Sequence, residues 1–216
     1  MILRNDPVIR TVAFASCYVY SPTGTGQMCD RSRLLRRFLK AGDAGLMVKH
    51  AGRVSQLAAH CAELRGFFTH ADVFIPVPGS SPYRAGHVWA AAQLASALLE
   101  QGLGQTCWCG LKRRRAVRKS ATAAPGSRPS VALHYDSFVI DSGPMSLGSV
   151  VLIDDVVTKG RTLLAAASRI HETFPNAKVR AFALIRTMGV IAGIRHLVDP
   201  CQGEIAWRGG DAQRTP

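Results

Sequence analysis

The segment Val150-Val151-Leu152-Ile153-Asp154-Asp155-Val156-Val157-Thr158-Lys159-Gly160-Arg161-Thr162-Leu163 decides how this chain folds. Its first four residues form an unbroken apolar run, which is typical of a parallel strand buried on both faces. Beyond the run, apolar residues recur at helical spacing until Pro175 ends the pattern; they are Leu163, Ala167, Ile170 and Phe174. The segment therefore predicts a strand, a tight turn and the start of a helix.

The turn brings together side chains suited to one kind of ligand: two carboxylates, two hydroxyls and a glycine, from Asp154, Asp155, Thr158, Thr162 and Gly160. The first turn of a helix presents backbone N–H groups and the positive end of the helix dipole to an anion. Carboxylates beside such a turn suit a ligand with hydroxyl groups as well as phosphate, and a ribose phosphate has both. On a regular strand, adjacent carboxylates point to opposite faces, so only one would face the ligand unless the chain turns at Asp155.

The same residues resemble the signature of the type I phosphoribosyltransferases, which has two acidic residues, two variable ones and then Thr-Thr-Gly-x-Thr. Asp154, Asp155, Thr158, Gly160 and Thr162 match it by position, and Lys159 replaces a usual threonine. The resemblance implies binding of 5-phosphoribosyl 1-diphosphate (PRPP), with Asp154 and Asp155 as the catalytic pair on the ribose hydroxyls. It implies that the phosphate-binding residues are Val156, Val157, Thr158, Lys159, Gly160, Arg161 and Thr162.

Magnesium is the cofactor that such a site implies, because Mg²⁺ prefers oxygen ligands and bridges ribose hydroxyls to pyrophosphate while keeping several waters. The protein then needs few metal ligands of its own, and we predict no dedicated metal site. A second buried strand from Asp72 runs into a turn whose N–H groups suit pyrophosphate. The candidate pyrophosphate-binding residues are Pro78, Gly79, Ser80 and Arg84.

Within the superfamily, the order of parts resembles the competence protein F (ComF) group. The matching parts are Pro76-Val77-Pro78, Gly86, Leu111 with Arg113, Phe138, and the segment from Asp154 onward. The group's usual N-terminal zinc-binding cysteines are missing from this chain. The resemblance implies a role in handling incoming or single-stranded DNA.

A run of positive charge follows a short predicted strand at Thr106 to Leu111. Its members are Lys112, Arg113, Arg114, Arg115, Arg118 and Lys119. We expect a mobile loop, for which three interpretations stay open: a lid that closes over pyrophosphate, a surface that binds nucleic acid, and a solubilising face.

Strands alternate with helices along the chain, which predicts an α/β fold: an open, mostly parallel twisted sheet with flanking helices, similar to the type I phosphoribosyltransferases. We expect one domain with three parts: an N-terminal strand and helix appendage (1–70), a core (71–190) and a tail (191–216). Within the core we expect a helix from Tyr83 to Gln101 and a strand from Tyr135 to Ile140. Residues Gly209 to Pro216 are expected to be disordered.

Composition limits the partners. Twenty-seven lysine and arginine residues against 14 aspartate and glutamate residues give a formal charge of +13, which favours phosphorylated metabolites and nucleic acid. No apolar stretch approaches the roughly 18 residues of a membrane helix, and no secretory pattern is present, so we expect a cytoplasmic protein without a membrane partner.

The cysteines form no Cys-x-x-Cys pair, so they predict neither a disulfide framework nor a zinc ribbon. They are Cys17, Cys29, Cys61, Cys107, Cys109 and Cys201. Cys107 and Cys109 would lie on one face of a strand.

The leading hypothesis is a PRPP-binding protein of the ComF type that transfers or senses a phosphoribosyl group with Mg²⁺ and handles single-stranded DNA. The alternative is a non-enzymatic nucleic-acid-binding regulator, or a defence-system effector, that retains the PRPP pocket. The acceptor substrate, the pathway and the choice between monomer and homodimer stay open.

Overall fold

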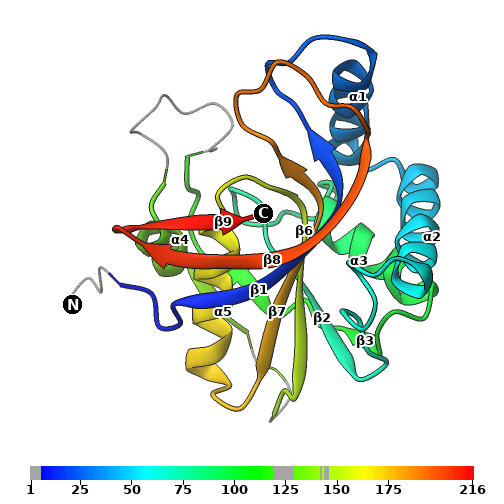
Figure 1. Ribbon diagram of the computed structural model, residues 1–216. Coiled ribbons are helices and arrows are strands. Elements are labelled where there is room, and N and C mark those ends of the chain that lie inside the picture. The colour runs from blue at the N-terminus through cyan, green and yellow to red at the C-terminus, as the bar shows by residue number, and fades with distance from the viewer. Residues whose placement is uncertain (1–5, 119–128, 142, 144–145) are drawn as a thin grey trace.

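A seven-stranded sheet forms the centre of the computed structural model, which describes residues 6–118, 129–141, 143 and 146–216 (Figure 1). The strand order is β3-β2-β6-β7-β1-β8-β9. The bounds are β1 (Thr11–Tyr20), β2 (Asp72–Pro76), β3 (Thr106–Cys107), β6 (Ser149–Val157), β7 (Lys178–Thr187), β8 (Val198–Arg208) and β9 (Asp211–Thr215). The strands from β3 to β1 pair in parallel, and β8 and β9 add an antiparallel edge. The predicted α/β fold with an open, mostly parallel sheet is confirmed.

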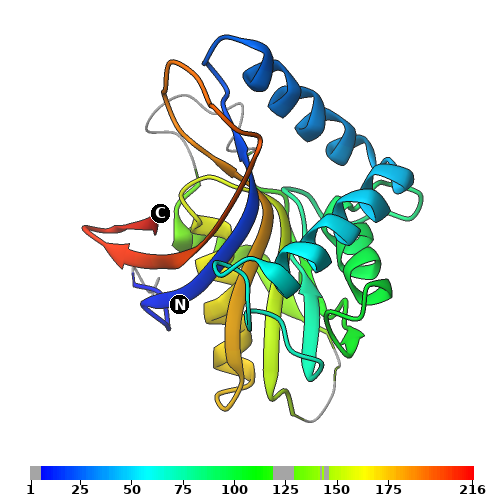
Figure 2. The ribbon, with the colours of Figure 1, turned by 45° about the vertical axis from the view of Figure 1, so that its right-hand side comes forward.

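Among the described residues, five helices cover the two faces of the sheet, as the ribbon views show (Figures 1 and 2). One face carries α1 (Gln27–Ala41), α2 (Ala44–His60) and α3 (Ala90–Glu100), and the other carries α4 (Val131–Ser137) and α5 (Arg161–Thr173). A separate pair of short strands, β4 (Leu111–Arg113) and β5 (Phe138–Ile140), packs beside α5. No helix among the described residues is both long and apolar enough to cross a membrane.

The central strand β6 explains the unbroken apolar run in the sequence. Val150 and Leu152 pack into the core beneath α5, while Val151 and Ile153 pack into the core beneath α1, α2 and α3. All four side chains are fully buried. A strand with helices on both faces needs apolar residues at every position rather than at every second one.

The N-terminal strand β1 occupies a different place from the one that we expected. It is an interior strand of the main sheet, paired with β7 on one side and β8 on the other, whereas α1 and α2 lie outside the sheet. Its side chains explain this position, because six consecutive residues from Phe14 to Val19 are buried. The strand that we assigned to the appendage is thus part of the sheet that positions the site.

Two predicted elements in the middle of the chain were wrong in part. Residues 135–137, which we expected to begin a strand, instead end the helix α4, whose start is capped by Ser130 accepting a hydrogen bond from the Leu133 N–H at 3.2 Å. Val131 and His134 then bury one side of that helix against α5. The helix α3 begins at Ala90 rather than Tyr83, after a loop in which Gly86 has a positive φ of 82°.

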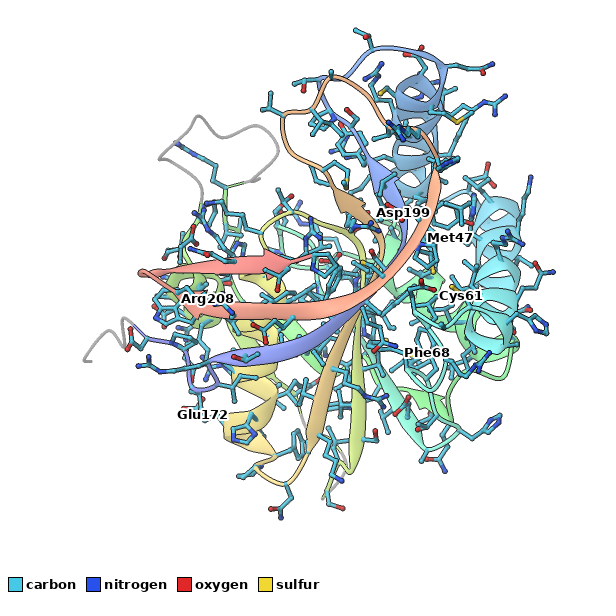
Figure 3. All side chains as sticks on the ribbon, in the orientation of Figure 1. Met47, Cys61, Phe68, Glu172, Asp199 and Arg208 are labelled. Atoms are coloured by element: carbon cyan, nitrogen blue, oxygen red, sulfur yellow. The ribbon has the colours of Figure 1, made fainter. Side chains whose placement is uncertain are left out.

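The C-terminal residues are ordered into a hairpin, so the expected disorder from Gly209 was wrong. Gly209 and Gly210, with φ of 58° and 80°, form the two-residue turn between β8 and β9. Such turns need positive φ at both central residues, which glycine adopts without strain. Figure 3 labels Asp199 and Arg208 near the two ends of β8, whose Ile205 is fully buried beneath the turn before α5.

Candidate phosphate pocket

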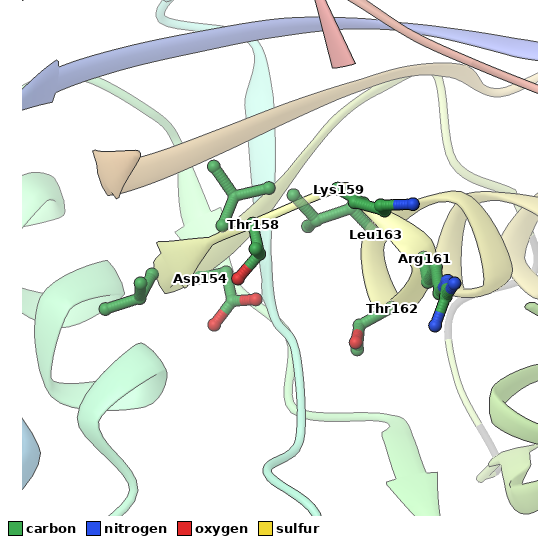
Figure 4. A pocket seen from close by; sticks show the side chains of 9 residues that line it. Asp154, Thr158, Lys159, Arg161, Thr162 and Leu163 are labelled. Carbon is green, nitrogen blue, oxygen red and sulfur yellow. The ribbon is translucent and has the colours of Figure 1, made fainter. Parts of the chain in front are cut away.

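A pocket of about 110 Å³ lies at the carboxyl end of β6, where the chain turns into α5 (Figure 4). It is lined by Asp154, Val156, Val157, Thr158, Lys159, Gly160, Arg161, Thr162 and Leu163. One continuous stretch of chain therefore supplies a carboxylate, two hydroxyls and the first turn of a helix. Of the residues predicted for this part of the site, Asp155 alone does not line the pocket.

The two adjacent carboxylates have different neighbours but lie close together. Asp154 lines the pocket, whereas Asp155 lies against Lys40 of α1. The pairing of β6 with β7 keeps one register through Val157, but the alternation of side chains ends at the carboxylates, because Val156 packs with the core beneath α1, α2 and α3 and Val157 with the core beneath α5. The two carboxyl groups are close enough for a hydrogen bond between their side chains.

Asp155 has a partner of its own on α1. The Lys40 ammonium, near the end of α1, lies 2.9 Å from Oδ1 and 2.6 Å from Oδ2 of Asp155. Asp155 is 4% exposed, so its carboxylate is compensated by Lys40 rather than by water. Burial alone would lower the pKa of Lys40, but the attraction of Asp155 and Asp154 raises it overall.

Asp154 is the less compensated carboxylate. Burial, and then the negative charge of Asp155, raise the pKa of Asp154 well above its usual range, although Lys40 acts in the opposite direction. Its Oδ1 accepts a hydrogen bond of 2.8 Å from the Asp155 backbone N–H. A cation or hydroxyl donor in the pocket would stabilise the charged form of this group.

Gly160 allows the turn between the pocket and α5. Its φ of 88° lies in the left-handed region, and it is the N-cap of the helix. A side-chain Cβ at this position would lie 2.5 Å from Cγ2 of Ile205 on β8. The glycine is therefore required by the backbone conformation and by β8, in addition to any ligand that approaches the turn.

The C-terminal hairpin holds the phosphate turn through Asp211, a residue that sequence reasoning missed. The Asp211 carboxylate accepts hydrogen bonds from Lys159 Nζ at 3.0 Å, from Arg161 Nε at 2.5 Å and from Arg161 Nη2 at 2.7 Å. On the same strand, Arg214 Nε donates to the Thr158 carbonyl at 3.0 Å. Lys159, which we predicted as a cation for phosphate, is thus paired within the protein. The Gly209-Gly210 turn signal could have revealed this hairpin.

His134 of α4 is a second missed neighbour of the pocket. Its Nε2 lies 3.5 Å from the Thr162 hydroxyl, and its ring is 4% exposed. Burial, reinforced by the positive charges of Arg113 and Arg161, lowers the pKa of His134 to about 3, so the ring is neutral. No sequence spacing marks this residue, because the packing of α4 on α5 brings it to Thr162.

The predicted pyrophosphate turn lies next to the pocket without lining it. The Val77 N–H donates to the Ile153 carbonyl at 2.8 Å, which sets the following residues, Pro78 to Ser80, beside Asp154. Arg113 Nε donates to the Gly79 carbonyl at 2.5 Å. Arg84, in the loop that follows, is exposed and is absent from the pocket lining.

Arg113 differs from the mobile cation that we expected. It belongs to β4, is 4% exposed, donates to the Ser137 hydroxyl and stacks on Phe138 with Cζ 4.3 Å from the ring centroid. Burial lowers the pKa of Arg113 to about 10. Since its donors are used by the protein, Arg113 cannot swing over a bound anion without breaking these contacts.

The rest of the basic segment is held at several points, although most of its charged side chains are exposed. The Val117 N–H donates to the Ser80 carbonyl at 2.8 Å, which joins the segment to the predicted pyrophosphate turn. Lys112 pairs with Asp141, and Arg114 Nε donates to the Asp136 carbonyl at 2.9 Å. Arg114, Arg115 and Arg118 are exposed, and Lys119 lies outside the described residues.

The described residues contain no group of three or more His, Cys, Asp or Glu side chains that could hold a metal ion. Asp154 is the single carboxylate in the pocket lining. A Mg²⁺ ion at this place would therefore take one protein ligand and fill its coordination from water and from oxygens of the ligand, which is its common mode in phosphate sites.

Comparison with known proteins found similarity to solved structures. No protein-family model matches the chain, and no curated protein matches it. A solved structure described as the glutamic acid mutant in an analysis of an invariant aspartic acid in HPRTs aligns with a TM-score of 0.32 and 14% identity, over 76% of this chain and 74% of that one. The assignment of the pocket therefore depends on its own residues.

We predict that Gly160→Ala destabilises the protein more than Gly86→Ala does. Both glycines have positive φ, which costs an alanine about 1–2 kcal/mol, but nothing lies within 4 Å of a Cβ at Gly86, whereas Ile205 lies 2.5 Å from one at Gly160. The added overlap should cost a further ~1–3 kcal/mol in the free energy of unfolding, measured by urea denaturation. Equal losses in the two variants would contradict the close packing of Ile205 on the turn.

We predict that the contribution of Asp211 to stability is lost in acid. Partial burial would raise the pKa of Asp211, but hydrogen bonds from Arg161 and Lys159 lower it to about 2, below the ordinary value near 3.9. A depressed folded-state pKa contributes stability above about pH 4 and loses it as the pH falls toward 2. At pH 7, urea denaturation of Asp211→Asn should therefore give a free energy of unfolding about 1–3 kcal/mol below that of wild type. This difference in free energy should narrow between pH 4 and 2. A difference that stays constant across this pH range would contradict the pairing. So would an equal difference in the exposed control Asp30→Asn.

Proposed function

We propose that the pocket binds a ribose phosphate, with PRPP as the candidate ligand, and that the protein is phosphoribosyltransferase-like. The observation that carries this proposal is that Asp154 and the first turn of α5 line one pocket. A carboxylate recognises hydroxyl groups, and a helix N-terminus recognises phosphate, so a ligand that satisfies both carries the two groups a few ångströms apart. A ribose 5-phosphate unit has this arrangement.

The size of the pocket suits a phosphate group of the ligand rather than the whole ligand. Its volume of about 110 Å³ is well below the roughly 300–1,000 Å³ of pockets that enclose drug-sized ligands. The first N–H groups of α5 have no intrahelical acceptors, and the Thr158 and Thr162 hydroxyls stand beside them in the lining (Figure 4). In this proposal, these groups hold the 5′-phosphate while the rest of the ligand extends past Asp154 toward the Pro78 turn.

Transfer of the phosphoribosyl group is the finer part of the proposal. Mg²⁺, bound through ligand oxygens and Asp154, would supply charge to the departing pyrophosphate. Asp154 would orient the ribose hydroxyls, and the turn before α5 would fix the phosphate end of the sugar. Because Asp155 is already neutralised by Lys40, we assign it a supporting role in place of direct contact.

Calorimetric titration of wild type and Asp154→Asn tests the binding proposal. Three ligands are compared: PRPP with Mg²⁺, ribose 5-phosphate and inorganic phosphate. Loss of a charge-assisted hydrogen bond of about 1.5–3 kcal/mol should weaken ribose 5-phosphate and PRPP at least tenfold. Inorganic phosphate lacks ribose hydroxyls, so its affinity should be unchanged or slightly stronger, because the variant removes a negative charge.

The exposed variant Asp30→Asn serves as the matched control and should bind all three ligands as wild type does. Equal affinity of wild type and Asp154→Asn for ribose 5-phosphate would refute the role of Asp154. Absence of phosphate binding in both would refute the pocket itself.

A second candidate function is binding of single-stranded nucleic acid, as the likeness to the ComF group implies. The observation that favours it is the exposure of Arg114, Arg115 and Arg118 beside the turn at Ser80. Cations in this position would contact the backbone phosphates of a strand. The DNA-handling role and the sensor or regulator alternative both depend on this surface.

Fluorescence anisotropy with labelled single-stranded DNA across a salt series tests this candidate. Each phosphate contact contributes about −0.7 to the slope of log affinity against log salt, so replacing Arg114, Arg115 and Arg118 by alanine should make the slope less steep by about 2. Replacing the exposed Arg31, Arg65 and Arg195 removes the same charge elsewhere and should change the slope less. Equal changes in both triple variants would reject a specific surface.

A further inference from the structure

Two thiols lie side by side on the edge strand of the sheet, outside the proposed phosphate pocket. The sulfurs of Cys107 and Cys109 are 4.0 Å apart. Cys107 is partly buried at the end of β3, and Cys109 is exposed just beyond it. The pair is therefore accessible from solvent on one side and supported by the protein on the other.

The backbone between the two cysteines is held in place by its neighbours. Trp108 points to the opposite face, where its ring packs edge-on against Phe174 with centroids 5.7 Å apart. The Trp108 N–H donates to the Phe74 carbonyl at 2.9 Å, which extends the pairing of β3 with β2. Because alternate residues share a face, fixing Trp108 on one side aligns the two thiols on the other. Their spacing is thus set before any ligand binds.

The distance between the sulfurs suits a bridging metal ion. It is about twice the roughly 2.05 Å of a disulfide bond, so the two groups are separate thiols. Two thiolates at about 2.3 Å from one tetrahedral ion are roughly 3.8 Å apart, and more open angles at the metal increase this separation. The observed spacing lies within that range and requires little movement.

We infer that Cys107 and Cys109 bind a soft monovalent metal ion, copper(I), through two thiolates. Thiolates select soft ions such as copper(I) and zinc. The part of the chain that the structure describes offers no cluster of three or more His, Cys, Asp or Glu side chains, so a four-coordinate zinc site has too few ligands. Copper(I) accepts two-coordinate binding, which the pair supplies.

Binding releases two protons. Each thiol loses its proton and each sulfur donates an electron pair to Cu⁺, which gives a bis-thiolate complex with a charge of −1; no electron is transferred. Because each ligand sulfur must lose its proton, affinity for copper(I) should increase with pH.

Competition with a chromophoric copper(I) chelator tests the inference on the full-length chain. Copper(I) is added as its acetonitrile complex under anaerobic, reducing conditions to wild type, Cys107→Ser, Cys109→Ser and Cys61→Ser. Wild type and the control Cys61→Ser should bind one equivalent with equal affinity, and each of the other two variants should lose at least tenfold. Circular dichroism of every variant establishes that it is folded, and Cys109→Ser changes only an exposed side chain.

Retention of full copper(I) affinity by folded Cys109→Ser would overturn the inference, as would a wild-type protein that binds zinc as tightly as copper(I). Affinity for ribose 5-phosphate should be the same in all four proteins. The outcome at the thiol pair is therefore independent of the outcome at the phosphate pocket.

Discussion

The pair of adjacent carboxylates at the end of β6 is the feature on which the site depends. Asp154 and Asp155 are close enough for a hydrogen bond between their side chains, and the charge of Asp155 disfavours ionisation of Asp154. One carboxylate enters the pocket, while the other pairs with Lys40 of α1. Two adjacent acidic residues thus have separate roles: Asp154 is available to a ligand, and Asp155 joins the helix layer to the central strand.

The C-terminal hairpin determines the charge at the phosphate turn. Asp211 pairs with Lys159 and Arg161, so both cations in the pocket lining are already partly neutralised. The attraction for a phosphate must therefore come largely from the helix N-terminus and the hydroxyls, with the paired cations adding less than their formal charges suggest. Ile205 on the same hairpin leaves no room for a side chain at Gly160. The conformation and charge of the turn therefore depend on contacts with β8 and β9 as well as on the sequence of the turn itself.

Local sequence patterns predicted the central strand, turn and helix, whereas long-range packing determined the contacts around them. The apolar run before Asp154 and the glycine after it predict the strand, turn and helix, because each signal lies within a few residues of its consequence. The Lys40 to Asp155 pair joins residues 115 positions apart, and no local pattern encodes it. Arg113 belongs to a charge run that suggests a solvated loop, yet Ser137 and Phe138 bury it. The Gly209-Gly210 turn could have been predicted from the sequence, since two glycines between alternating residues are a hairpin signal.

A crystal structure with ribose 5-phosphate bound tests the central claim most directly, because it locates both ends of the ligand at once. The account predicts the phosphate at the first turn of α5, near the Thr158 and Thr162 hydroxyls, with ribose hydroxyls at Asp154 and the Lys40 to Asp155 pair intact. A ligand whose phosphate lies elsewhere while this turn holds only solvent at saturating concentration would contradict it. So would a ligand that displaces Lys40 and contacts both carboxylates.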